Sequence, residues 1–93
     1  MVVWSVPARD DLKRIHDYIA LDSKYYARRV IDALIEKAEL LLEFPEMGRK
    51  VPEIGDAKIR EIPIYSYRLI YKYSTHGIEV LTVVHSKQIF ADV

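Results

Sequence analysis

The residues of this chain best suited to chemistry are cationic and aromatic side chains in its last third. Arg60 and Arg68 fall in segments with the alternating pattern of β-strands, and His85 and Lys87 follow the last such segment. Arginine is costly on a strand, because many strand positions face a core. We therefore expect these side chains to point at an anionic ligand, a nucleic acid or a protein partner.

Each of these residues also has a purely structural interpretation. Arg68 would then pair with Glu61 or Glu79 across the sheet, an interaction worth less than about 1 kcal/mol at a surface. Arg60 would be solvated on the sheet surface. His85 would be a hydrogen-bonding partner rather than a catalyst.

Arg49 has two interpretations as well, because it follows Gly48 just after a predicted helix end. It would either contact a target, or have a structural role in which it caps the helix carbonyls or pairs with Glu46 or Glu53. The tyrosines of the strands could stack on bases, although the alternation favours a core position for Tyr71.

The histidines and serines outside this region predict neither a metal site nor a nucleophile. His16 and His76 have no second ligand at a suitable spacing. Ser23 and Ser86 lack a histidine–acid partner. Cysteine is absent, which excludes disulfides and thiolate metal sites. We expect no cofactor.

Length and charge indicate one small domain spanning residues 1–93 that does not depend on bulk attraction to nucleic acid. Fourteen lysines and arginines balance fourteen aspartates and glutamates, and about half of the residues are apolar. From Lys58 onward the chain is mildly basic. The longest apolar run, residues 40–42, is too short to span a bilayer. The N-terminus shows no signal-peptide pattern, so a cytoplasmic location is expected.

The periodicity predicts the elements that must position the candidate residues. Residues 2–4 read as a short strand, and residues 7–20 as an amphipathic helix capped by Ser5. A second helix begins after Ser23 and ends at Phe44-Pro45. Residues 46–56 read as a loop, because they are rich in glycine and proline.

Three strands follow, with period-2 alternation around residues 59–62, 67–73 and 78–84, and residues 74–77 form a hairpin turn. The predicted fold is α+β with the order β-α-α-β-β-β. A helical hairpin packs on one face of a small, mainly antiparallel sheet.

The same segments resemble the RelE/ParE superfamily of toxins from type II toxin–antitoxin pairs. The resemblance covers nearly the whole chain and is carried by strings in residues 8–20, by Phe44-Pro45 and Gly48-Arg49, by Arg60-Glu61, by Tyr67-Arg68-Leu69-Ile70-Tyr71 and by Val83-Val84-His85. It implies the fold just described. It also implies growth inhibition, a role in plasmid stabilization, and neutralisation by a cognate antitoxin in a toxin–antitoxin hetero-oligomer.

The resemblance implies two alternative activities. ParE-like members inhibit DNA gyrase, whereas RelE-like members cut mRNA on the ribosome without a metal. An inactive relic that only binds its antitoxin is a third alternative. The neutral net charge favours the ParE-like activity. So does the region between the second helix and the next long strand, which is lysine-rich in strong ribonucleases of the superfamily but has only Arg49, Lys50 and Lys58 here.

Arg68, His85 and Lys87 match positions that are catalytic in RelE-like members. The resemblance therefore implies that they are catalytic only if this protein is RelE-like. Target or antitoxin binding is expected of Arg49, Arg60, Arg68, Lys87 and Phe90. Two departures weaken the catalytic assignment. Phe90 stands where many ribonuclease members have tyrosine and so lacks a hydroxyl. Lys87 replaces arginine and so lacks its bidentate fork.

Overall fold

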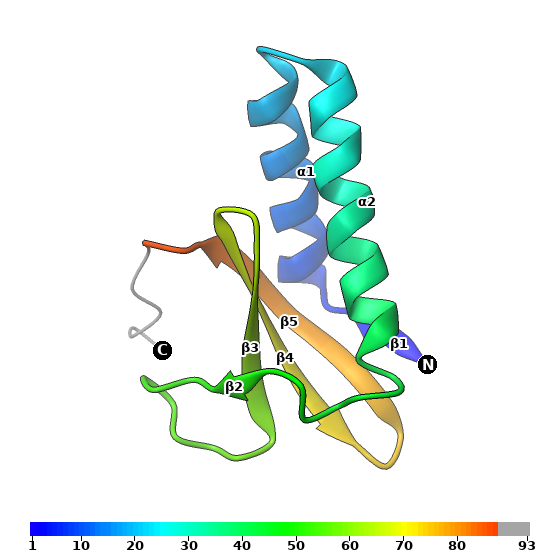
Figure 1. The fold of residues 1–93 in the computed structure, drawn as a ribbon, viewed down its shortest axis with the longest axis vertical. Helices are drawn as coiled ribbons and strands as arrows, with labels where there is room; N and C mark the ends of the chain where they lie inside the picture. Colours follow the sequence, from blue (N-terminus) through cyan, green and yellow to red (C-terminus); the bar gives the residue numbers. More distant parts are fainter. Residues whose placement is uncertain (88–93) are drawn as a thin grey trace.

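The structure, a computed structural model, describes residues 1–87. Two helices stand against a twisted sheet, with the helical hairpin extending beyond one end of the sheet (Figure 1). The elements follow in the order β1 (Val2–Trp4), α1 (Val6–Ala20), α2 (Lys24–Leu40), β2 (Arg49–Lys50), β3 (Ile59–Ile64), β4 (Tyr67–Ser74) and β5 (Gly77–His85).

The five strands form one mixed sheet in the order β1-β5-β4-β3-β2. Strands β2 to β5 pair antiparallel, and β1 pairs parallel with β5. This arrangement confirms the predicted α+β fold and its helical hairpin. The short strand β2 was missed, because two residues within a loop carry no period of their own.

Both helices begin at the serines that the sequence indicates. The Ser5 side chain accepts a hydrogen bond from the Ala8 N–H, and the Ser23 side chain accepts one from the Tyr26 N–H. The second helix ends at Leu40, earlier than the predicted stop at Phe44-Pro45. Turns connect Leu40 to the proline, so Pro45 lies beyond the helix end rather than defining it.

The main core lies between the helices and one face of the sheet. The α2 residues that face it recur at helical spacing: Ala27, Val30, Leu34 and Ala38. Leu34, Leu69 and Tyr71 are fully buried within the same cluster. Helical and strand periods thus place one apolar stripe against one sheet face.

Beyond the end of β1, Ser5 and helix α1 supply hydrogen-bond partners for the exposed edge of β5. The Ser5 N–H donates to the Val80 carbonyl, and the Ser5 hydroxyl donates to the Leu81 carbonyl. Further along, the buried Asp11 carboxylate accepts from the Val83 N–H at 2.9 Å and from the Thr82 hydroxyl at 2.5 Å. These contacts satisfy polar groups of β5 that β1 does not reach.

Candidate functional site

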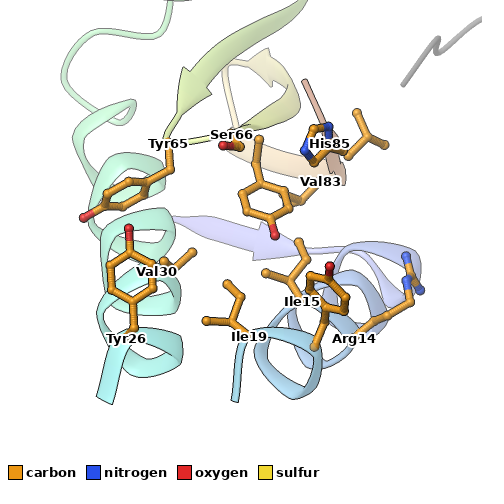
Figure 2. Close-up of a pocket in the computed structure, with 12 residues that line it drawn as sticks. Arg14, Ile15, Ile19, Tyr26, Val30, Tyr65, Ser66, Val83 and His85 are labelled. Atoms are coloured by element: carbon orange, nitrogen blue, oxygen red, sulfur yellow. The ribbon is translucent and has the colours of Figure 1, made fainter. Parts of the chain in front are cut away.

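An aromatic pocket of about 580 Å³ opens between the two helices and the sheet. Ile15, Ile19 and Val30 supply its apolar helix side (Figure 2). The pocket is also lined by polar and aromatic side chains from both helices, from the turn between β3 and β4, and from β4 and β5: Arg14, Tyr18, Tyr26, Tyr65, Ser66, Tyr67 and His85. Such an apolar hollow with a polar rim is the usual form of a binding site.

Two tyrosines from distant parts of the chain form one side of this pocket. The rings of Tyr26 on α2 and Tyr65 in the β3–β4 turn meet edge to face, with centroids 6.4 Å apart. Both rings are at least half exposed. Figure 2 shows them together on one side, with Arg14 and His85 on the opposite side. The pair leaves aromatic surface available to a ligand.

The opposite side of the pocket carries the imidazole of His85, which lies next to Tyr67. The His85 ring packs edge to face on Tyr67 with centroids 5.8 Å apart, and His85 Nδ1 accepts a hydrogen bond from the Lys87 N–H. In the neutral ring the proton is therefore on Nε2. Burial, with a smaller contribution from nearby Tyr18, raises the pKa of Tyr67, so its phenol stays neutral at physiological pH.

A second cluster, which we call the Glu61 cluster, joins Arg49, Glu53, Glu61 and Arg68. The Glu61 side chain is only 1% exposed and accepts from Arg68 Nη1 at 2.6 Å and from Arg49 Nε at 2.7 Å. Arg68 Nη2 also lies 3.5 Å from Glu53 Oε2. The Arg68 side chain is 11% exposed, whereas that of Arg49 is 73% exposed.

Arg60 lies on the other face of β3 from its neighbour Glu61. Its guanidinium makes hydrogen bonds and a ring contact within the protein. It donates to the carbonyls of Gly48 at 2.9 Å and Ala57 at 3.1 Å, and it lies over the Tyr73 ring at 5.7 Å. These bonds tie the chain around β2 and the residues before β3 to the sheet.

The structure therefore separates the residues that the resemblance groups as catalytic. His85 packs on Tyr67 at the pocket, and Arg68 is the next residue along β4, so its side chain leaves the opposite face of the sheet. Lys87 lies exposed in the turn after β5. Phe90 lies outside the described residues.

The sequence did not single out Arg14. It placed Tyr26 in an apolar stripe of the second helix, residues 26–41, that was expected to leave a groove for an antitoxin, and it offered Tyr65 only as a tyrosine that could stack on bases. The signal for Tyr26 was the width of this stripe, which exceeds what a small sheet can cover. For Tyr65 the signal was a bulky residue in a two-residue connection between strands, where glycine or asparagine is usual. Arg14 carried no distinguishing pattern.

Within residues 1–87, no group of three or more histidine, cysteine, aspartate or glutamate side chains is arranged to hold a metal ion. In the same part of the chain, no helix combines the length and apolar character needed to cross a membrane.

The fold matches a solved toxin–antitoxin structure. The chromosomal ParDE system from P. aeruginosa superposes with a TM-score of 0.74 at 18% sequence identity, covering 92% of this chain and 95% of that one. The two structures share the α+β fold of two helices packed on a mixed sheet.

Sequence comparisons agree with the fold. The family described as "ParE toxin of type II toxin-antitoxin system, parDE" matches residues 2–90. Toxin RelE2 of Caulobacter vibrioides is 32% identical over 89 residues, covering 95% of this chain and 97% of the relative. The chain therefore belongs to the ParE toxin family of type II toxin–antitoxin systems, within the RelE/ParE superfamily.

Proposed function

We propose that this toxin inhibits growth by binding an essential enzyme such as DNA gyrase, in the ParE-like manner, rather than by cutting RNA. The observation that carries this proposal is the position of Arg68. Its guanidinium is mostly buried and is held by the Glu61 carboxylate at 2.6 Å. A cation neutralised in this way contributes little to stabilising the charge that develops on a phosphate.

Metal-free RNA cleavage would need a different arrangement of side chains from the one observed. It requires cations around one phosphate and a titratable group near the attacking 2′-hydroxyl. Here His85 and Arg68 leave opposite faces of the sheet, and Lys87 is in a turn. This separation favours a binding function. Arg49 and Lys87 are the more exposed cations of the proposed contact set, and Arg60, Arg68 and Phe90 complete that set.

The partner that neutralises the toxin is a cognate antitoxin, and we assign its docking site to the aromatic pocket. The half-exposed rings of Tyr26 and Tyr65 and the apolar side chains beneath them would be covered by an apolar antitoxin segment. A toxin–antitoxin hetero-oligomer follows from this contact.

The test is controlled expression in a growing bacterial culture, with plasmid supercoiling and mRNA integrity measured in the same cells. We expect growth arrest with altered supercoiling and intact mRNA, and rescue by co-expression of the adjacent reading frame. Arg49→Ala should reduce toxicity more than Lys50→Ala, its exposed neighbour on β2. Rapid mRNA cleavage with normal supercoiling would contradict the proposal.

A RelE-like ribonuclease is the second candidate, favoured by the 32% identity to the relative named Toxin RelE2. In that case Arg68, His85 and Lys87 would be catalytic, and Phe90→Tyr would raise activity by restoring a hydroxyl. Ribosome-bound mRNA cleavage would be compared in wild type, in Phe90→Tyr, and in Phe90→Tyr with His85→Ala. A chain that is non-toxic but binds its antitoxin would instead be an inactive relic.

A further inference from the structure

Tyr65 has a backbone conformation that its residue type disfavours. It is the first of the two residues connecting β3 to β4, and its φ is +54°. Among the described residues it is the one non-glycine residue with positive φ. Glycine, asparagine or aspartate normally occupy such positions, because a β-carbon crowds the backbone there. A bulky residue held in this way indicates a function that outweighs the strain.

The fold gains little from the Tyr65 ring. The residue is 56% exposed and lies outside the hydrophobic core cluster, whereas Ile64 and Tyr67 on either side of the turn pack in or against that cluster. Its described ring contact is the edge-to-face approach to Tyr26, which is itself 50% exposed. The strain is therefore not explained by core packing.

The positive-φ conformation of Tyr65 places its ring along one side of the pocket. Tyr65 and Tyr26 stand across from His85 and Arg14, with Ile19 beneath (Figure 2). Removing the Tyr65 ring would open the pocket toward solvent on that side. A rigid aromatic side chain provides a large contact area and loses little conformational entropy on binding.

Charge indicates what the pocket accepts. Among the described residues that line it, Arg14 is the one permanent cation and none is a carboxylate, although the Arg14 guanidinium already pairs with the carboxylate of Asp11 outside the lining. Single-stranded RNA would require several phosphate-binding cations along its path. An apolar polypeptide segment matches this lining, and a carboxylate on it could accept from the Arg14 N–H groups that Asp11 does not use, since that side chain is 68% exposed.

We infer that Tyr65 is a specificity-determining anchor of the antitoxin interface, held in a strained turn so that its ring forms the wall against which an apolar, acid-bearing antitoxin segment packs. The inference rests on the proposed docking of the antitoxin in this pocket. Tyr65 is thus a binding residue whose unfavourable backbone geometry is kept for recognition.

The test compares Tyr65→Ala, Tyr65→Gly and Tyr65→Phe. The full-length toxin is purified in complex with the product of the adjacent reading frame, separated by denaturation and refolded. Calorimetry measures the Kd for that antitoxin, and thermal unfolding measures the Tm of the free toxin. Tyr25→Ala is the matched control, because Tyr25 is an exposed α2 tyrosine that does not line the pocket.

We expect Tyr65→Ala and Tyr65→Gly to weaken antitoxin binding equally, by about 10-fold or more, as for a buried aromatic anchor. Tyr65→Gly should nevertheless unfold about 4–8 °C above Tyr65→Ala, because glycine relieves the strain of positive φ. Tyr65→Phe and Tyr25→Ala should bind within about 3-fold of wild type. Equal affinities of Tyr65→Ala and Tyr65→Gly at unequal Tm would separate recognition from folding.

Three results would overturn the inference. If Tyr65→Gly bound the antitoxin as tightly as wild type, the inference about Tyr65 would fail. Antitoxin binding, and hence the proposed function, would still stand. Affinities that follow Tm, with Tyr65→Gly binding better than Tyr65→Ala, would make the residue structural. Tyr65-dependent binding of a labelled single-stranded RNA of about 12 nucleotides, displaced by the antitoxin, would change the class of ligand. A wild-type toxin that binds no antitoxin would instead refute the proposed docking itself.

Discussion

Arg68 on β4 donates a hydrogen bond to Glu61 on β3, and the carboxylate that receives it is almost completely excluded from solvent. The Nη1–Oε1 distance is 2.6 Å. A buried carboxylate requires such a partner, because an isolated charge in the interior is strongly destabilising. The most suggestive arginine of the sequence thus has a structural task, whatever else it contacts.

Arg68→Ala should lower the free energy of unfolding by about 3–5 kcal/mol, because it leaves the Glu61 charge buried with only the exposed Arg49 beside it. Urea denaturation monitored by Trp4 fluorescence measures this change. Replacing both partners, as in Glu61→Leu with Arg68→Met, should recover most of the loss, since apolar residues of similar volume need no pairing.

Lys72→Ala is the control for Arg68→Ala, because Lys72 is an exposed cation on the same face of β4. It should change stability by less than about 0.5 kcal/mol. Equal effects of the two changes would mean that the buried pair contributes nothing specific. Toxicity lost in Arg68→Ala but retained in the double replacement would show that the loss comes from unfolding.

Asp11→Ala should destabilise the fold by about 1–3 kcal/mol, because the Val83 N–H and the Thr82 hydroxyl lose their acceptor at the edge of β5. Its exposed neighbour allows a close comparison: Asp10→Ala should have little effect. Hydrogen exchange should also become faster at the Val83 amide in Asp11→Ala. An unchanged Val83 exchange rate would contradict this assignment.

Tyr71→Phe should cost about 1–3 kcal/mol at neutral pH. The Tyr71 hydroxyl donates to the Pro45 carbonyl at 2.7 Å and accepts from the buried Gly48 N–H at 3.0 Å, so phenylalanine leaves both groups without this partner. Tyr73→Phe is the control, since its hydroxyl bonds to Glu46 at the surface. Equal costs for the two changes would argue against a special role of the buried hydroxyl.

The alkaline stability of the protein should depend on the same Tyr71 hydroxyl. Burial raises the pKa of Tyr71, so the folded state keeps the phenol proton to a higher pH than the unfolded chain does. Stability from this group is complete below about pH 10 and falls as pH rises above it. The stability difference between wild type and Tyr71→Phe should therefore narrow in urea titrations above pH 10.

Gly48→Ala should destabilise the protein by about 1–3 kcal/mol. A β-carbon there would lie 2.6 Å from the Glu61 carbonyl oxygen and 2.9 Å from the Tyr71 hydroxyl, and the backbone atom cannot move cheaply. Gly55→Ala provides the contrast, because Gly55 has open space around it and only its φ of +77° opposes a side chain. A loss at Gly48 no larger than the loss at Gly55 would contradict the crowding of Gly48 by the Glu61 carbonyl.

The sequence alone determined the elements that depend on local spacing. Periods of 3.6 and 2 residues identified both helices and the three long strands, and Ser5 and Ser23 marked the two helix starts. These signals are local, because a cap or an amphipathic stripe is defined within a few residues. The α+β fold followed from the order of the elements, and family resemblance supplied the toxin class.

Tertiary structure decided which chemical groups meet. Arg68 and Glu61 are seven residues apart, and strand register across β3 and β4 selected this pair over Glu79. Tyr26 meets Tyr65 only because α2 packs against β3 in the tertiary structure. Register and helix packing depend on the whole core at once, so no short window of sequence encodes them.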